Sequence, residues 1–219
     1  MITCVIIPTY NEAKEIFRLV KQIKENNLDV LVVDDGSTDS TARIASSAGA
    51  VVLINPVNEG KGACLKKGFK YALTHDFDAV ITMDGDGQHL PEDLSCLIHQ
   101  AIKSGSDVFV GNRMRQTKGM PWLRVITNKF MSLVISVLSK QSIPDTQCGF
   151  RLIKRAVLEK VELKTNKFET ETEILIKAAR LGFKIESVPV KTVYRGEKSQ
   201  INPFVDTFRF LRLVIKGSK

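Results

Sequence analysis

Short apolar runs alternate with helical patterns in the first half of the chain, and this alternation limits the folds available to it. The runs are 4–7, 30–33, 51–54 and 79–83. Each is apolar at nearly every position, as in a strand buried on both faces, so they predict parallel strands in a sheet that helices cover on both sides. A further strand is expected at 107–111, and helices are expected around 42–45 and at 12–26, 63–74 and 91–103. The pattern predicts an α/β fold with a mostly parallel central sheet.

The composition allows one globular domain with a sizeable core. The chain has 219 residues, of which 43% are hydrophobic and 26% are charged, and these values are ordinary for a soluble globular protein. The net charge of +8 is not ordinary. It indicates an anionic partner, such as nucleotide phosphates, anionic lipid head groups or nucleic acid.

The four cysteines are scattered and form no Cys-x-x-Cys pair. Together with an N-terminus that runs straight into a strand, without a secretory signal, they predict reduced thiols in a cytoplasmic protein. No stretch reaches ~18 uninterrupted apolar residues, so no membrane-spanning helix is expected. Segment 125–138 is mostly apolar, and it is expected to be either core or an amphipathic helix at a membrane surface.

Three polar clusters follow predicted strands, at 9–12, 34–39 and 84–89. The carboxyl ends of parallel strands form one edge of a sheet, and ligands of open α/β folds bind there. In the last cluster Asp84 and Asp86 are two residues apart, so we expect their side chains on the same side. Two such carboxylates suit Mg²⁺ or Mn²⁺, which could also hold the oxygens of a diphosphate. An isolated Asp-x-Asp is more often an ordinary turn, but three clusters at one edge favour a ligand site.

Two common phosphate-binding motifs are absent from the sequence. Gly60-Lys61-Gly62 lacks the Ser or Thr that follows the lysine of a P-loop, and no Gly-x-Gly-x-x-Gly follows the first strand. A P-loop and a standard dinucleotide site are therefore not expected. Lys61 is expected either to contact a phosphate or to be a solvated surface lysine.

Several ordered segments resemble family-2 glycosyltransferases of the GT-A fold. They are Pro8-Thr9-Tyr10-Asn11-Glu12, Val33-Asp34-Asp35-Gly36-Ser37-Thr38-Asp39, Gly60-Lys61-Gly62 and Met83-Asp84-Gly85-Asp86-Gly87-Gln88-His89-Leu90-Pro91-Glu92-Asp93. Similarity to the dolichyl-phosphate mannose/glucose synthase branch comes from this last segment, Gly111-Asn112-Arg113 and Asp145-Thr146-Gln147-Cys148-Gly149-Phe150-Arg151. The resemblance covers nearly the whole chain. It implies inverting transfer of a hexose, glucose or mannose, from a nucleotide-diphosphate sugar to a polyprenyl or dolichyl phosphate.

The resemblance also implies roles for individual residues. Those for the nucleotide sugar are Pro8, Tyr10, Glu12, Asp35, Lys61, Asp84, Gln88, Arg195 and Lys198. A metal, Mg²⁺ or Mn²⁺, would be held by Asp84, Asp86 and Gln88. The acceptor phosphate would be bound by Arg113, Arg124 and Asn128, where the family often has Ser at the last position. Arg124 and Asn128 are four apart and share a helix face. The catalytic set would be Asp84, Asp86, Arg113 and Arg124.

The last third of the chain carries further glutamates and basic residues. Glu169, Glu171 and Glu173 favour solvated carboxylates on a helix at 169–181, although Glu171 or Glu173 could be a base toward a hydroxyl acceptor. The resembling branch has a basic loop near 194–200 that usually ends in Ser-Lys, whereas this chain has Ser199-Gln200. Arg195 would keep its role in closing that loop over the diphosphate, and Lys198 would substitute for the missing lysine. The tail has an apolar stripe with basic flanks, typical of a helix at a membrane surface or packed on the sheet.

These features predict a GT-A catalytic domain at 1–200 and an amphipathic tail at 201–219. Residues 1–111 would bind UDP- or GDP-hexose and 112–200 the lipid acceptor, on the cytoplasmic face of a membrane, with no nucleic-acid partner. A family-2 transferase acting on a soluble or polysaccharide hydroxyl is the first alternative. A sugar-1-phosphate nucleotidyltransferase usually has a Gly-rich basic loop after the first strand, which is missing here. A basic lipid- or nucleic-acid-binding module would leave the carboxylate clusters unused, and aromatic residues are not interleaved with the basic ones.

Overall fold

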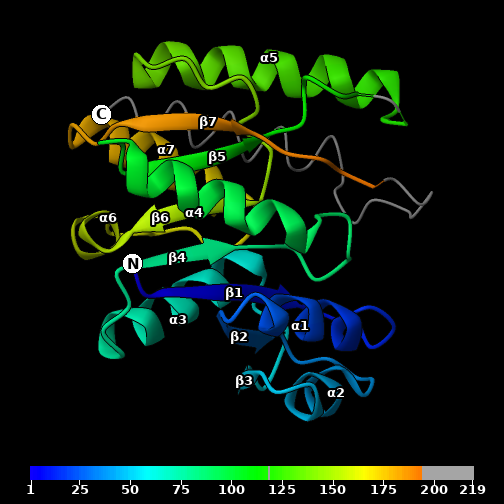
Figure 1. Ribbon diagram of the computed structural model, residues 1–219. Coiled ribbons are helices and arrows are strands. Elements are labelled where there is room, and N and C mark those ends of the chain that lie inside the picture. Colours follow the sequence, from blue (N-terminus) through cyan, green and yellow to red (C-terminus); the bar gives the residue numbers. More distant parts are fainter. Residues whose placement is uncertain (118, 194–219) are drawn as a thin grey trace.

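A computed structural model of the protein describes residues 1–117 and 119–193 (Figure 1). Its strands are β1 (Thr3–Thr9), β2 (Asp29–Asp34), β3 (Val51–Ile54), β4 (Ala79–Thr82), β5 (Val108–Asn112), β6 (Arg151–Lys154) and β7 (Ile185–Pro189). Its α-helices are α1 (Ile16–Glu25), α2 (Thr41–Ser47), α3 (Lys61–Thr74), α4 (Leu94–Lys103), α5 (Trp122–Ser139), α6 (Arg155–Lys160) and α7 (Glu169–Arg180). A single 3-10 turn at Pro91–Asp93 leads into α4.

The described strands form one seven-stranded sheet in the order β3-β2-β1-β4-β6-β5-β7. Strands β1 to β4 are parallel, as the continuous apolar runs predicted. β6 is antiparallel to both β4 and β5, and β5 is parallel to β7. In Figure 1, α4 lies in front of the sheet and α3 behind it. The predicted α/β class with a mostly parallel sheet is confirmed.

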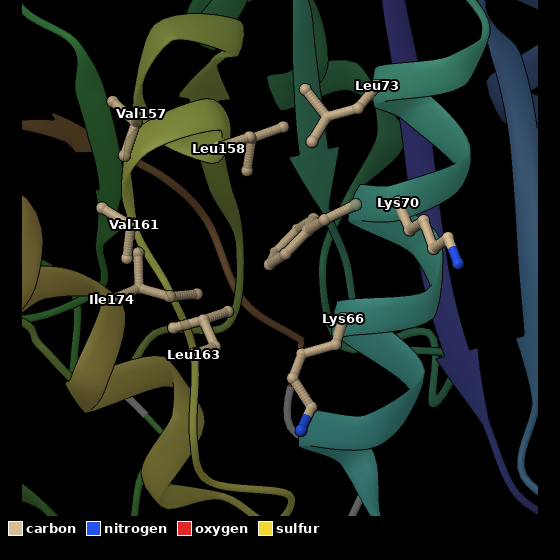
Figure 2. A pocket seen from close by; sticks show the side chains of 9 residues that line it. Lys66, Lys70, Leu73, Val157, Leu158, Val161, Leu163 and Ile174 are labelled. Atoms are coloured by element: carbon tan, nitrogen blue, oxygen red, sulfur yellow. The ribbon is translucent and has the colours of Figure 1, made fainter.

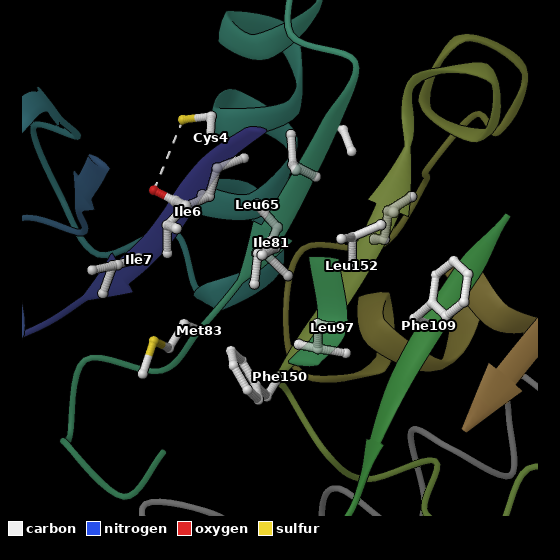
Figure 3. Packing of buried hydrophobic residues seen from close by; sticks show 14 of the residues in the cluster. Cys4, Ile6, Ile7, Leu65, Ile81, Met83, Leu97, Phe109, Phe150 and Leu152 are labelled. Carbon is white, nitrogen blue, oxygen red and sulfur yellow. Dashed lines mark hydrogen bonds between the residues drawn. The ribbon is translucent and has the colours of Figure 1, made fainter. Parts of the chain in front are cut away.

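The interior of the sheet explains why the runs that form its central strands are apolar at nearly every position. Ile6 and Ile7, which point to opposite faces of β1, are both fully buried. Figure 3 shows Ile81 of β4 facing Leu152 of β6, its register partner, with Leu65 of α3 beside them. Helix and strand side chains therefore form one continuous core around the central strands.

Three details differ from the sequence-based expectations. Strand β3 lies at the sheet edge, so Val51 and Ile54 are exposed and not buried on both faces. Strand β6 was not expected, and it separates β4 from β5, which follow each other in the first half of the chain. Helix α1 begins at Ile16, four residues later than expected, because Asn11 has a left-handed backbone (φ 58°) and its side chain binds another loop.

Candidate active site

The polar clusters after β1 and β2 bind each other directly. The amide of Thr38 donates to Asn11 Oδ1 at 2.9 Å, and the amide of Asn11 donates to Ser37 Oγ at 2.9 Å. The amide of Glu12 donates to Thr41 Oγ1 at 2.9 Å. These bonds confirm that the first two clusters meet at the carboxyl edge of the sheet. Pro8, Tyr10 and Glu12 lie in this region and are partly exposed, so their contacts with a nucleotide stay predictions.

Asp35 is buried and uses both of its carboxylate oxygens inside the protein. Oδ1 accepts hydrogen bonds from Asn55 Nδ2 and the Glu59 amide, both at 2.9 Å, and Oδ2 accepts one from the Gly60 amide at 2.7 Å. The residue implied to meet the nucleoside therefore also fixes the loop before α3. Because α3 begins at Lys61, these bonds from the preceding loop to Asp35 fix the position of Lys61.

Lys61 lies between two carboxylates and is mostly buried. Its Nζ is 2.5 Å from Asp84 Oδ1 and 2.9 Å from Glu171 Oε2. Burial alone would lower the pKa of Lys61, but the charges of Asp84 and Glu171 raise it above its usual value. Burial would likewise raise the pKa of Asp84, yet the charge and hydrogen bond of Lys61, together with other basic groups nearby, outweigh that effect and lower it to about 2. Lys61 and Asp84 are therefore charged at neutral pH, and Lys61 is not a solvated surface lysine.

Gly149 marks the point where these three charged groups converge. A Cβ added there would lie 2.8 Å from Asp84 Oδ2, 2.9 Å from Lys61 Nζ and 3.0 Å from Glu171 Oε1. Glycine is thus needed because the charged side chains approach the backbone closely. Glu171 Oε1 is buried and has no hydrogen-bond partner within the described part of the chain.

The expectation that the α7 glutamates are solvated was wrong for two of them. Glu171 is largely buried against Lys61. Glu173 is buried, accepts hydrogen bonds from the amides of Lys164 and Thr165, and pairs with Lys177 Nζ at 2.7 Å. The local pattern on α7 could not show this, because the burial comes from elements that pack on the helix.

His89 was not predicted as a site residue, although it lies in the quoted 83–93 segment. It is buried, its Nε2 is 3.9 Å from Asp84 Oδ2, and its ring stacks on Phe150 at 5.2 Å between centroids. Burial lowers the pKa of His89 to about 4, so the ring is neutral at neutral pH. A neutral imidazole beside Asp84 leaves Lys61 as the cation that binds this carboxylate most closely in the described residues.

Asp86 and Gln88 lie in the turn that follows Asp84. The Gln88 amide donates to Asp86 Oδ1 at 2.9 Å, and both side chains are partly exposed. Within residues 1–117 and 119–193, no three His, Cys, Asp or Glu side chains are grouped to hold a metal ion by themselves. Mg²⁺ usually binds through one or two carboxylates together with substrate phosphates. Asp84 and Asp86 fit that mode, with a bound diphosphate supplying the remaining oxygens.

Arg113 and Asp145 form a buried ion pair next to this cluster. Arg113 Nε lies 2.8 Å from Asp145 Oδ2, and its second terminal nitrogen donates to Oδ1 at 3.0 Å. Arg113 also lowers the pKa values of Asp84 and His89 through its charge. Arg113, which the resemblance assigns to the acceptor phosphate, is therefore close enough to Asp84, which it assigns to the donor, for the two charges to interact.

Helix α5 joins this region through the loop at 145–149. The Thr146 amide donates to Ser132 Oγ at 2.9 Å, next to Asp145. Asn128, one turn before Ser132 on α5, is buried, and its Nδ2 has no partner among the described residues. Arg124 lies one further turn back and is partly exposed. The structure thus places Asn128 and Arg124 along one helix that packs on the Asp145 loop.

Arg151 is a second residue whose importance the sequence did not show. It is almost completely buried, and its guanidinium donates to the carbonyl oxygens of Cys148, Thr146 and Glu171. These bonds join the 145–149 loop to the first turns of α7. Arg151 therefore positions Gly149 and Glu171, and its only sequence signal was its place at the end of the quoted motif.

The outer face of α5 is apolar and exposed. Its members are each more than half exposed: Trp122, Leu123, Ile126, Phe130, Leu133 and Val137. The helix has 18 residues and contains the whole of the apolar segment 125–138. By length and composition alone α5 could cross a membrane, and 22% of it is buried in the protein. A helix that is core would be mostly buried, so α5 does not fit the alternative in which this segment is core.

An apolar pocket of about 200 Å³ lies elsewhere, between α3 and the α6–α7 region (Figure 2). Leu73, Val157 and Ile174 are among its lining residues, with Lys66 and Lys70 at the α3 side. None of the predicted site residues lines it. Arg195, Lys198, Gln200 and the 201–219 tail fall outside the described residues.

The fold and the site define an α/β protein whose candidate ligand-binding residues gather at the carboxyl ends of parallel strands. Residues 4–162 match Glycosyl transferase family 2. The chain belongs to this family and is therefore a glycosyltransferase.

Named relatives share about a third of their residues with the chain. The polyprenol monophosphomannose synthase of Mycolicibacterium smegmatis is 31% identical over 202 residues, which cover 86% of this chain and 76% of that protein. The UDP-N-acetylglucosamine–dolichyl-phosphate N-acetylglucosaminyltransferase of Methanococcus voltae is 30% identical over 212 residues, 86% of this chain and 84% of that protein. The two names give different sugars, so the relatives do not fix the sugar.

Solved structures share the fold. Glucosyl-3-phosphoglycerate synthase from Mycobacterium tuberculosis, crystallised with Mn²⁺, UDP and glucosyl-3-phosphoglycerate, superposes with a TM-score of 0.74 over 97% of this chain and 77% of that one, at 21% identity. The same protein has been crystallised with Mg²⁺ and UDP. This similarity supports the GT-A fold.

Proposed function

We propose that the protein transfers a hexose, glucose or mannose, from a UDP- or GDP-sugar to a polyprenyl phosphate. The named relatives support a lipid-phosphate acceptor. The observation that carries the proposal is the position of Arg113, which pairs with Asp145 on the loop whose Gly149 lies against Asp84, Lys61 and Glu171. A site that brings a phosphate-binding arginine beside an acidic diphosphate site can align an anionic nucleophile with the sugar.

The chemistry requires alignment and charge stabilisation more than proton transfer. An acceptor phosphate oxygen forms a bond to the anomeric carbon while the bond from that carbon to the nucleoside diphosphate breaks, and the configuration inverts. The acceptor is already an anion, so no strong base is needed. Arg113, Arg124 and Asn128 would orient the acceptor, and Lys61 would contact the departing diphosphate.

Asp84 and Asp86, with Gln88, would hold Mg²⁺ or Mn²⁺. Bound there, the ion would neutralise the charge that develops on the diphosphate. Asp84 is 31% exposed despite its pair with Lys61, so an ion arriving with the donor can reach this carboxylate.

The exposed apolar face of α5 supports contact with a membrane. It lies on the helix that carries Arg124 and, on its buried side, Asn128, so a membrane on this face would hold the proposed acceptor site near the lipid surface. The net charge of +8 favours anionic lipid. We place the protein peripherally on the cytoplasmic face of a membrane.

One observation favours the alternative of a hydroxyl acceptor. Glu171 is buried beside the site, and its Oε1 is unpartnered within the described ranges, as a general base could be. Its other oxygen, however, is 2.9 Å from Lys61 Nζ, so the carboxylate is already engaged in an ion pair. The phosphate acceptor therefore has the stronger support.

The test begins with calorimetric titration of the purified chain with UDP and with GDP, each with and without Mn²⁺. Tight binding of one nucleotide that requires Mn²⁺ is expected. Labelled donor is then offered with polyprenyl phosphate, with the matching polyprenol and with a soluble sugar. Transfer to polyprenyl phosphate alone supports the proposal, whereas transfer to either hydroxyl acceptor supports the alternative. A folded sample that binds neither nucleotide contradicts both.

A further inference from the structure

Lys61 is a cation that belongs to the protein and occupies the acidic cluster at the proposed donor site. Its ammonium bridges Asp84 Oδ1 and Glu171 Oε2, at 2.5 and 2.9 Å. We propose that Lys61 gates metal binding: it neutralises Asp84 in the free enzyme and releases that carboxylate only when a nucleoside diphosphate arrives with the ion. The inference rests on the proposed donor and metal sites and adds a coupling between them.

The position of Lys61 is fixed from two directions, so its bridge is not a chance surface pair. Asp35 holds the Gly60 amide at 2.7 Å, which sets the first residue of α3. The Ala63 amide donates to the Asn166 carbonyl at 3.0 Å. At Gly62 an added Cβ would lie 2.6 Å from the Asn166 carbonyl carbon, so the start of α3 packs directly on the chain leading into α7. The lysine and Glu171 therefore face each other across a tight helix contact.

The two carboxylates hold Lys61 in different ways. Asp84 is partly exposed and lies at the end of β4, where an incoming ion can reach it. Glu171 has 13% of its side chain exposed, and its second oxygen lies over Gly149. When Asp84 turns to an ion, Glu171 can keep the ammonium beside the site. From there Lys61 can donate to the diphosphate oxygens, because an ammonium has three donors.

This arrangement makes metal and diphosphate bind cooperatively. An ion without a diphosphate must compete with an ammonium that has no other anion in the cluster except Glu171. An ion that arrives with a diphosphate brings new oxygens that the Lys61 ammonium can bind. Asp84 can then leave Lys61 for the ion, because the diphosphate replaces Asp84 as a partner of the ammonium. Coupling of this kind is reciprocal: the ion strengthens diphosphate binding by the same factor as the diphosphate strengthens ion binding.

The test measures Mn²⁺ binding without nucleotide in the wild type and in Lys61→Gln. Removal of the competing charge should raise the affinity for Mn²⁺ alone at least tenfold, while the affinity for UDP or GDP in excess Mn²⁺ should fall about tenfold. Lys70→Gln is the matched control, because Lys70 is exposed on the same helix and carries the same charge. Its affinities should equal those of the wild type. Lys61→Arg keeps the charge, so it should bind Mn²⁺ alone as weakly as the wild type.

Equal Mn²⁺ affinity in Lys61→Gln and the wild type, in a protein that binds its nucleotide with Mn²⁺, would overturn the gate and leave the proposed function standing. Absence of nucleotide binding in the wild type would instead contradict the proposed function. If Lys61→Gln does not fold, a second measurement on the wild type tests the gate. The side-chain ammonium signal of Lys61, identified by its loss in Lys61→Arg, should shift with Mg²⁺ plus nucleotide and stay in place with Mg²⁺ alone. A signal that fails to shift with both ligands contradicts the gate.

Discussion

Arg113 and Asp145 make a two-point ion pair inside the protein, with 2.8 and 3.0 Å between donors and acceptors. Arg113 directly follows β5, and Asp145 begins the loop that leads to β6. The Arg113 amide also donates to Asp145 Oδ2 at 3.1 Å. The pair therefore joins a strand end to the loop carrying Gly149 and fixes a positive charge near Asp84.

Loss of one partner of this pair should destabilise the fold strongly. Asp145→Ala leaves the Arg113 guanidinium buried without its counter-charge, which typically costs about 3–5 kcal/mol of unfolding free energy. Urea denaturation measures the effect. Glu159→Gln is the control, since it removes the exposed pair with Arg155 and should change stability by no more than about 1 kcal/mol. Similar losses of unfolding free energy in both variants would contradict a larger contribution from the buried pair.

Asp86→Asn should remove metal-dependent transfer and leave the fold intact. The asparagine oxygen can still accept the Gln88 amide, so the turn keeps its hydrogen bond. It lacks the negative charge that Mg²⁺ or Mn²⁺ requires, and we expect kcat/KM to fall by about a hundredfold or more. Steady-state kinetics and thermal unfolding are measured on the same sample. Near-normal turnover would contradict the assignment of Asp86 to the metal.

Gly149→Ala should disturb the charged cluster without unfolding the protein. The new methyl group would press on the ends of the Asp84, Lys61 and Glu171 side chains, which must shift to admit it. We expect a loss of about ten- to a hundredfold in kcat/KM, and a change in stability below about 1 kcal/mol. Gly105→Ala is the matched control, because an added Cβ there meets no atom within 4 Å. Full activity in Gly149→Ala would show that the cluster tolerates displacement.

We expect the free energy of unfolding to decrease in mild acid because His89 is buried in its neutral form. Burial lowers its folded pKa to about 4 from an ordinary 6.5, so between these pH values the unfolded chain binds the proton and the folded chain does not. Stability is then full above pH 6.5 and falls as the pH drops toward 4, by at most about 3 kcal/mol. The Asp84–Lys61 pair persists in this window because the Asp84 pKa is about 2.

Urea denaturation between pH 4 and 7.5 measures this slope. His89→Gln should flatten it, whereas His75→Gln, which changes an exposed histidine, should leave it as in the wild type. An unchanged slope in His89→Gln would assign the acid sensitivity to other groups.

The exposed face of α5 should be needed for membrane binding. Phe130→Ser with Leu133→Ser removes two apolar side chains that are 60% and 63% exposed, so vesicle co-sedimentation should fall while thermal stability changes little. Ile102→Ser on α4 removes a side chain that is 65% exposed elsewhere, and its vesicle binding should equal that of the wild type. Vesicles contain anionic phospholipid. If the Phe130→Ser/Leu133→Ser variant binds vesicles as well as the wild type does, α5 is not the membrane contact.

The sequence predicted the parallel half of the sheet because strands buried on both faces leave a local signal. The runs at 4–7, 30–33 and 79–83 became β1, β2 and β4, and polar clusters after them marked the ligand edge. Strand β6 left no comparable signal. It has four residues, with Arg151 and Lys154 at its ends, and it is a strand because β4 and β5 pair with both of its edges.

The sequence by itself determined the fold class, the family and the residues Asp84, Asp86, Arg113 and Asn128 as candidates, because these depend on local patterns and ordered motifs. Only the tertiary structure decided how the charges combine. Lys61 meets Glu171 because α3 packs on the chain before α7, and Arg113 meets Asp145 because a loop folds back on β5. Charge pairing depends on distance and burial between segments far apart in the chain, and no local pattern contains that information.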